Sequence, residues 1–242
     1  MKKALILIDY DNLSSNQKSS IQLLIEQILC HLANTDQLDK FIKGDVRVYG
    51  GWYEEDKLTA LAAQLNMIFQ DPVTGKVFDK NGQEILYNFQ ILLAQSLLSA
   101  PTQDFWRTYR KKSNPSRGIR FSQEMKSCSF SGNVMAQVKT LITTGLCPHS
   151  DCPNYSEENL VIYRAEQKMV DTLMSCDLVY SAIISPDSDY VVVVSGDDDF
   201  YPALVLAGQF NNCSLVHVIP KASAQSNNLG VSPNCITLEI RL

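Results

Sequence analysis

The sequence predicts an α/β fold: a mainly parallel sheet flanked by helices. Short apolar runs without polar interruption, at residues 4–8 and 190–194, are typical of strands buried on both faces. Amphipathic helical patterns follow the first of these runs, as in strand–helix units. Two of the runs end directly in aspartates, which matches the position of functional sites at the carboxyl ends of strands in open α/β sheets.

Each element is expected from its own local pattern. Continuous apolar runs predict strands, and an alternating run near the carboxyl terminus predicts an edge strand. The expected strands are residues 4–8, 46–49, 67–69, 190–194, 215–219 and the alternating 236–240. Apolar residues recurring every three or four positions predict helices, the first after Ser19 or Ser20 as cap. The expected helices are residues 21–32, 58–65, 169–174, 201–208 and, in mid-chain, 89–98.

Composition indicates a globular protein with a sizeable core. The chain has 242 residues, of which 45% are apolar and 19% charged, and this excludes disordered, collagen-like and coiled-coil proteins. No apolar run is long enough for a bilayer, and the first has only five residues before Asp9, too few for a signal peptide. We therefore expect a cytoplasmic protein without membrane contact.

The middle of the chain interrupts the strand–helix alternation. A turn signal at residues 79–82 precedes the apolar stretch 89–98 and then a polar stretch rich in Arg, Lys and Ser. We interpret residues 1–75 and 160–242 as the catalytic core and residues 76–160 as an insertion.

Two carboxylate clusters follow apolar strands. The first comprises Asp9, Asp11 and Asn12, and the second is the run Ser195-Gly-Asp-Asp-Asp-Phe. Asp is a poor strand former and adjacent like charges repel, so solubility alone does not explain three consecutive aspartates. The alternative is a strand-to-helix turn in which Asp caps the next helix.

Taken together, three motifs resemble the NYN family of PIN-like ribonuclease domains. They are D-x-x-N after the first strand, K-x-V-D on a later helix and S-G-D-x-D-F after a following strand. The matching residues are Asp9, Asn12, Lys168, Val170, Asp171, Asp177, Ser195, Gly196, Asp197, Asp199 and Phe200. The match covers the start of the chain and residues 164–210, and leaves out 76–160.

The resemblance implies a PIN-like, Rossmann-like three-layer sandwich and a ribonuclease that depends on Mg²⁺ or Mn²⁺. By this resemblance the catalytic and metal-binding residues are Asp9, Asp171, Asp197 and Asp199, and the substrate-binding residues are Asn12, Ser195 and Lys168. Products with a 5′-phosphate and a 3′-hydroxyl follow from the same family pattern. The chemistry agrees, because hard divalent cations prefer carboxylate oxygens and crowded carboxylates repel unless a cation lies among them.

Asp177 fits this set less well. It lies six positions after Asp171, so on one continuous helix the two side chains point about 240° apart. The alternative is a helix-end residue or a surface charge.

A basic stretch with interleaved aromatics falls in the insertion. Its cations are Arg107, Arg110, Lys111, Lys112, Arg117 and Arg120, and its aromatics are Trp106, Tyr109 and Phe121. Cations that meet phosphates and aromatics that stack on bases are typical of single-stranded nucleic-acid binding. We expect Arg110, Lys111 and Lys112 to bind single-stranded or structured RNA. In a chain of net charge −5 with an acidic site, this basic patch would supply the attraction to RNA that the site lacks. The alternative is a flexible charged loop.

The seven cysteines are more consistent with thiols or metal ligands than with disulfides. The density of Cys and His in the insertion suggests a structural Zn²⁺ site at Cys128, Cys147, His149 and Cys152, with free thiols in a loop as the alternative. Cys30, Cys176 and Cys213 lie in apolar sequence and are expected in the core, as is His217.

Two other functions fit parts of the pattern. Asp9 and Asp11 after an apolar strand match the nucleophile motif of haloacid-dehalogenase-type phosphatases, but Leu13 and Tyr201 stand where that family has Thr or Val and Asp. The other is an RNA-binding or scaffold module whose nuclease site is silent, against which the intact acidic set argues. A homo-oligomer or a partner protein stays open.

Overall fold

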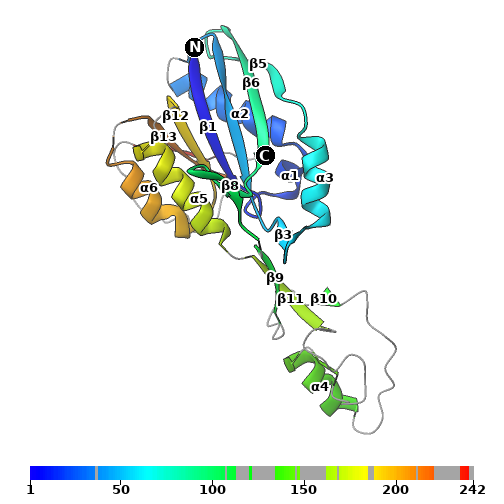
Figure 1. Cartoon of the computed structure of the whole chain (residues 1–242). Coiled ribbons are helices and arrows are strands. Elements are labelled where there is room, and N and C mark those ends of the chain that lie inside the picture. Colours follow the sequence, from blue (N-terminus) through cyan, green and yellow to red (C-terminus); the bar gives the residue numbers. More distant parts are fainter. Residues whose placement is uncertain are drawn as a thin grey trace. The chain divides into compact units, whose positions relative to one another are not determined.

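The computed structural model divides into two compact units. The larger comprises Met1–Thr108 and Met169–Leu242, and the smaller Tyr109–Lys168. The structure describes residues 1–35, 38–106, 108–112, 120–121, 134–144, 146–147, 162–167, 169–184, 188–210, 212–220 and 235–239. Figure 1 shows the ribbon of both units.

A seven-stranded mixed sheet forms the centre of the larger unit, with strand order β14-β13-β12-β1-β2-β6-β5. The strands are β1 (Lys2–Asp9), β2 (Phe41–Tyr49), β5 (Val73–Phe78), β6 (Glu84–Leu93), β12 (Tyr190–Val194), β13 (Ser214–Ile219) and β14 (Cys235–Glu239). Every neighbouring pair is parallel except β5 and β6, which form an antiparallel hairpin. The expected α/β class with a mostly parallel sheet is confirmed, and β14 lies at the expected edge.

Helices flank both faces of the sheet (Figure 1). They are α1 (Ser15–Ser19), α2 (Ile21–Thr35), α3 (Ala60–Ile68), α5 (Val170–Val179) with a π-helical continuation (Tyr180–Ile184), and α6 (Tyr201–Ala207). The side chains of β1 alternate between two apolar clusters: Ile6 packs in the cluster of α2, and Leu7 in the cluster of α5 and α6. Burial on both faces explains why β1 and β12 read as continuous apolar runs.

Helix starts follow the local capping chemistry. The Ser20 hydroxyl accepts a hydrogen bond from the amide of Leu23 at 3.3 Å, which satisfies a free donor at the start of α2. Thr59 does the same for Ala62 at 3.2 Å at the start of α3. The expected helices beginning near residues 21, 58, 169 and 201 are all present, the last two without a side-chain cap.

Two expected elements are wrong. Residues 67–69 form the end of α3 rather than a strand. The expected helix at 89–98 is occupied mainly by β6, whose residues alternate strictly between exposed and buried from Glu84 to Phe89, the pattern of period two that defines a strand. Residues 76–108 consequently belong to the larger unit, and the second unit begins at Tyr109 rather than at residue 76.

The turn between β5 and β6 forms at the expected residues 79–82. The Asp79 carboxylate accepts from the amides of Asn81 at 2.8 Å and Gln83 at 2.7 Å. Gly82 adopts φ +78°, a conformation that glycine takes without strain.

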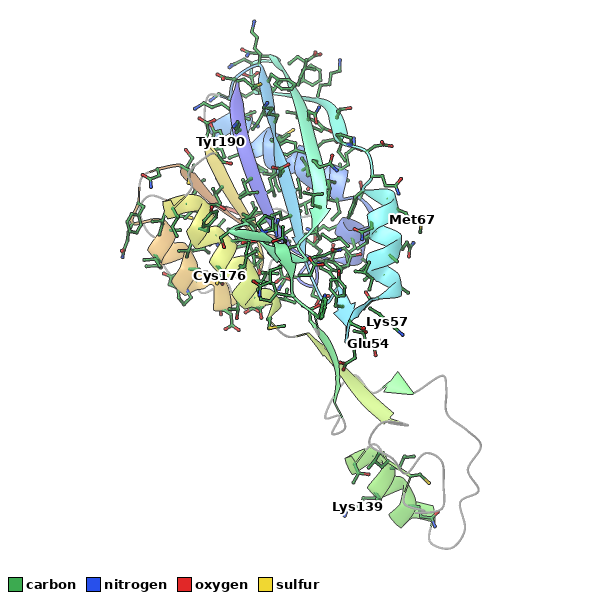
Figure 2. All side chains as sticks on the ribbon, viewed as in Figure 1. Glu54, Lys57, Met67, Lys139, Cys176 and Tyr190 are labelled. Atoms are coloured by element: carbon green, nitrogen blue, oxygen red, sulfur yellow. The ribbon has the colours of Figure 1, made fainter. Side chains whose placement is uncertain are left out.

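Short elements complete the larger unit. A tight hairpin is formed by β3 (Tyr53–Glu54) and β4 (Lys57–Leu58), and a second pair by β7 (Ser96–Leu97) and β8 (Ala100–Asp104). Figure 2 marks Glu54 and Lys57 on the first hairpin.

The smaller unit is built around antiparallel strands. Its elements are β9 (Tyr109–Lys112), β10 (Arg120–Phe121), β11 (Ile162–Gln167) and α4 (Val134–Thr144). β11 pairs with both β9 and β10. Across the described part of both units, no helix combines the length and apolar character needed to cross a membrane.

Candidate acidic site at the carboxyl edge of the sheet

Two neighbouring strands bring the first and third sequence motifs together. β1 and β12 are parallel and in register, with Ile8 opposite Val194. Asp9 and Ser195 therefore follow at the same edge of the sheet. The Ser195 hydroxyl donates to Asp9 Oδ2 at 3.1 Å, and both residues are buried.

Asp9 is held by several donors. Asn12 Nδ2 donates to Asp9 Oδ2, and the amide of Asp11 donates to Asp9 Oδ1 at 3.2 Å. Burial raises the pKa of Asp9, and the hydrogen bonds from Asn12 and Ser195 oppose that rise by stabilising the carboxylate. The D-x-x-N motif thus acts locally: Asn12 orients the aspartate three residues before it.

The loop after β12 combines two roles. The amide of Asp197 donates to the Ser195 hydroxyl at 3.1 Å, and Asp197 Oδ1 accepts from the amide of Asp199 at 3.0 Å. Asp197 thereby caps a 3-10 turn (Asp198–Phe200) that leads directly into α6. The capping alternative raised by the sequence is therefore present at Asp197, whereas Asp198 and Asp199 are exposed.

The second motif places Asp171 in the first turn of α5. Partial burial raises the pKa of Asp171 to about 6, and the charges of Asp9, Asp197, Asp199 and Asp11 add to the rise. All four of these charges are negative, so carboxylates from two other chain segments act on Asp171. Three of them, Asp9, Asp197 and Asp199, belong with Asp171 to the set predicted from the sequence.

The donor types at this edge suit a divalent cation, but the side chains do not enclose one. Carboxylate oxygens are the ligands that Mg²⁺ prefers. Among the residues that the structure describes, no three His, Cys, Asp or Glu side chains are arranged to hold a metal ion together. Asp9 and Asp197 instead direct carboxylate oxygens at Asn12, Ser195 and the Asp199 amide.

Comparisons with known proteins are negative. No family model, curated protein or solved structure matches the chain. The resemblance to the NYN family rests on the motif residues and their order.

Several predicted site residues lie outside the described residues: Lys168, Cys128, His149 and Cys152. Of the proposed zinc ligands only Cys147 is described, and it is buried. Arg110, Lys111 and Lys112 lie on β9, where they pair with Glu166, Ala165 and Arg164 of β11. The basic residues at this position therefore belong to a strand, an element that the sequence pattern did not suggest.

The thiols and the histidine outside the motifs divide between core and surface. Cys30 and Cys213 pack against the two apolar clusters, as expected, whereas Cys176 is exposed on α5 and its expected place in the core is wrong (Figure 2). His217 Nε2 lies 3.0 Å from the carbonyl oxygen of Ser195, and burial lowers the pKa of this imidazole. A neutral ring that donates through Nε2 supports the loop after β12.

A buried polar cluster that the sequence analysis missed lies beside the acidic edge. Asp177 is fully buried and lies 3.3 Å from an Arg47 guanidinium nitrogen, and the Tyr49 hydroxyl donates to it at 2.7 Å. Asp177 is thus neither a surface charge nor a member of the acidic cluster. A usable signal was Arg47 within the apolar run of residues 46–49, because a charge in a buried strand requires a buried partner.

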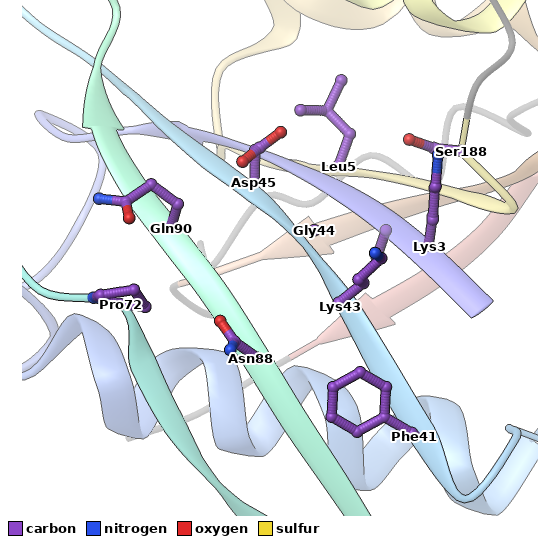
Figure 3. Close-up of a pocket in the computed structure, with 11 residues that line it drawn as sticks. Lys3, Leu5, Phe41, Lys43, Gly44, Asp45, Pro72, Asn88, Gln90 and Ser188 are labelled. Atoms are coloured by element: carbon purple, nitrogen blue, oxygen red, sulfur yellow. The ribbon is translucent and has the colours of Figure 1, made fainter. Parts of the chain in front are cut away.

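An open pocket of about 530 Å³ lies at the other end of the sheet, near the amino ends of β1 and β2 (Figure 3). Lys3, Lys43, Asp45, Asn88 and Gln90 contribute its polar lining. Lys3 pairs with Lys43 in the strand register, whereas Asp9 pairs with Tyr49 at the opposite end of the same two strands. The pocket is therefore separate from the acidic edge.

Proposed function

We propose that this protein is a PIN-like ribonuclease of the NYN type that hydrolyses phosphodiester bonds of RNA with the aid of Mg²⁺ or Mn²⁺. The observation that carries the proposal is the crowding of Asp171, whose pKa is raised to about 6 by partial burial and by the negative charges of Asp9, Asp197, Asp199 and Asp11. A fold that needed these residues only for capping or solubility would gain nothing from placing them together, because their repulsion destabilises the folded state. Strained electrostatics of this kind cluster at functional sites.

The residues divide by role. Asp9, Asp171, Asp197 and Asp199 would hold the cation, and they are also the residues assigned to catalysis. Asn12 and Ser195 donate to Asp9; they orient its carboxylate and oppose the rise in its pKa that burial causes. In the proposal Asn12 and Lys168 also contact the RNA, whereas Ser195, predicted to bind substrate, is fully buried and acts through Asp9.

A divalent cation bound here supplies Lewis-acid stabilisation of the negative charge that develops on the phosphodiester during attack. The protein's own contribution is to fix donors on two adjacent strand ends and on the first turn of α5. Because the carboxylates of Asp9 and Asp197 already accept protein hydrogen bonds, the proposal requires side-chain rearrangement when a cation binds.

Attraction to RNA must come from outside the acidic edge. Arg110, Lys111 and Lys112 on β9 bring three consecutive cations to the smaller unit. Trp106 is 57% exposed, which is unusual for the largest apolar side chain and leaves its ring available for stacking on a base. These features support RNA rather than a small phosphomonoester as substrate.

The test is incubation with a mixed RNA pool in Mn²⁺ or in EDTA, followed by sequencing of the new ends. We expect cleavage in Mn²⁺ only, and a loss of about 100-fold or more in rate for Asp197→Asn, because the charge that holds the cation is gone. Asp198→Asn is the matched control, since Asp198 is the adjacent exposed aspartate outside the predicted set, and it should retain the parent rate. Equal rates for Asp197→Asn and Asp198→Asn would contradict the assignment.

A further inference from the structure

Beneath the acidic edge, one side of the sheet carries a buried ion pair that the proposed catalytic set does not use. Arg47 and Tyr49 are two residues apart on β2, so both side chains lie on the face of the sheet that α5 covers. Asp177 comes from the last turn of α5. Asp177 is completely inaccessible to solvent, and Arg47 is 8% exposed. Burying two charges is unfavourable unless their geometry and remaining hydrogen bonds are well satisfied.

The hydrogen bonds of this cluster are satisfied from three directions. Asp177 Oδ2 accepts from the Tyr49 hydroxyl at 2.7 Å and faces Arg47 at 3.3 Å, while Oδ1 accepts from the amide of Leu98 at 2.8 Å. Arg47 in turn donates to the carbonyl oxygen of Ser96 and, through Nε, to the Tyr49 hydroxyl at 3.3 Å. The carboxylate therefore joins α5 to β2 and to the segment around β7.

Tyr49 connects this cluster to the acidic edge. In the register of β1 and β2, Tyr49 is the residue opposite Asp9, and its carbonyl oxygen accepts from the amide of Tyr10 at 2.9 Å. Asp177 and Asp171 lie on the same helix, α5, and six residues of helical rise place them about 9 Å apart along its axis. Asp9 is thus linked to Asp171 in three steps: the strand register from Asp9 to Tyr49, the hydrogen bond from Tyr49 to Asp177, and helix α5 from Asp177 to Asp171.

The remaining contacts of α5 are less directional. Val170, Leu173, Met174 and Leu178 pack against the sheet through apolar contacts, which tolerate small rotations and translations. The amino end of α5 has no side-chain cap, and Met169 before it adopts the left-handed conformation at φ 65°. Directional hydrogen bonds at Asp177 are therefore the contacts that best define the rotation and axial position of α5.

We propose that Asp177, with Arg47 and Tyr49, is a positioning residue that holds α5 in the one setting that brings Asp171 beside Asp9. This inference rests on the proposed metal-dependent function, because it assigns Asp177 a role in that site without contact to metal or substrate. Displacement of a catalytic group by about 1 Å can cost about 100-fold in rate, so a positioning residue affects activity beyond its effect on folding.

The experiment compares Asp177→Asn with Met174→Ala on the same helix. Met174 is fully buried in the apolar cluster and carries no charged or hydrogen-bonding side-chain group, so its truncation destabilises α5 while the groups that bond Asp177 stay in place. Tyr49→Phe is the milder second variant, which removes only the hydroxyl that donates to Asp177. All proteins are assayed at a temperature at which each is folded, for the Mn²⁺ concentration that gives the half-maximal thermal shift, and for kcat and KM on an RNA oligonucleotide.

We expect Asp177→Asn and Tyr49→Phe to raise the Mn²⁺ midpoint by about tenfold and to lower kcat with KM for RNA nearly unchanged. Met174→Ala should lower Tm but leave the Mn²⁺ midpoint and kcat close to the parent values. If Asp177→Asn and Tyr49→Phe behave like Met174→Ala, the positioning role is overturned while the proposed function stands. A parent protein with neither a Mn²⁺ shift nor cleavage is a different result, and it overturns the proposed function together with this inference.

Discussion

The two ends of α5 place the same residue type in opposite electrical surroundings. Asp171 in the first turn is only partly buried and acted on by four negative charges, whereas Asp177 in the last turn is fully buried and receives three donors, one of them cationic. The second arrangement is what a carboxylate needs for stability, since its charge is compensated. The first does not stabilise the fold, which is why we assign Asp171 to function and Asp177 to positioning.

The largest expected effect on stability comes from removing the cation of the Arg47–Asp177 ion pair, at the compensated end of α5. Arg47→Met leaves the Asp177 carboxylate buried without its cation, so we expect a loss of about 3–5 kcal/mol in the free energy of unfolding, measured in urea. The double variant Arg47→Met with Asp177→Asn removes both charges and should recover part of that loss. Strictly additive losses would show that the two charges do not compensate one another.

The crowded end of α5 repels RNA, so the comparison predicts that attraction comes from elsewhere in the chain. Removing the charges of residues 110–112 on β9 should reduce the slope of log affinity for single-stranded RNA against log salt by about 2, from three phosphate contacts. The control variant neutralises Lys3, Lys43 and Lys76 of the larger unit, which carry the same total charge and are exposed. If the β9 variant and this control change the slope equally, β9 has no special part in RNA binding.

The raised pKa of Asp171 at the crowded end of α5 should also make the thermal stability of the metal-free protein depend on pH. The pKa of about 6 for Asp171 lies above its ordinary value of 3.8, so the folded state binds this proton more tightly than the unfolded state. The stabilisation of the folded state by this proton is complete below pH 3.8 and is lost as pH rises through 6. The protein in EDTA should therefore have a higher Tm at about pH 5 than at about pH 7. Burial raises the pKa of Asp9 in the same direction.

The quantity that isolates Asp171 is the difference between parent and Asp171→Asn. The variant should show a smaller gain in Tm between pH 7 and pH 5, because the carboxyl group whose pKa is raised by burial and by the neighbouring charges is gone. Identical pH profiles would contradict a raised pKa at Asp171.

The smallest effect separates the two roles of Asp197. Asn caps helices as well as Asp does, so Asp197→Asn should leave the stability of the metal-free protein unchanged or slightly raised by reduced repulsion. Asp197→Ala also removes the acceptor for the Asp199 amide and should cost about 1 kcal/mol. Thermal unfolding in EDTA measures both; a loss in Asp197→Asn as large as in Asp197→Ala would contradict the separation.

An element of the fold is predictable from the sequence when residues close to it in the chain determine it. The strands at 4–8 and 190–194 and the helix at 21–32 follow from patterns that involve only neighbouring residues, and they are present. The stretch 89–98 is a dense apolar run that satisfies helical spacing, while the exposed positions that reveal its alternation begin earlier, at Glu84. The expected insertion accordingly starts at residue 76, more than thirty residues before Tyr109, where the smaller unit begins.

The candidate site divides in the same way. Asp9 ends β1, Asn12 follows it, and the Ser195–Phe200 run follows β12, so their convergence follows once the two strands are parallel neighbours. The partners of Asp177 lie 79 and 128 residues away in the chain, at Leu98 and Tyr49. No local pattern marks such pairs, and only the lone Arg47 in an apolar strand hints at them.

The most direct test of the account is a calorimetric titration of Mn²⁺ into the metal-free protein. We predict one saturable binding event in the parent and a loss of affinity of about tenfold or more in Asp171→Asn. Asp189→Asn is the control, because this carboxylate pairs with Lys2 and the amide of Lys3 at the opposite end of the sheet, and it should bind Mn²⁺ as the parent does. No binding in the parent, or equal binding in the parent and Asp171→Asn, would contradict the claim that the crowded aspartates form a cation site.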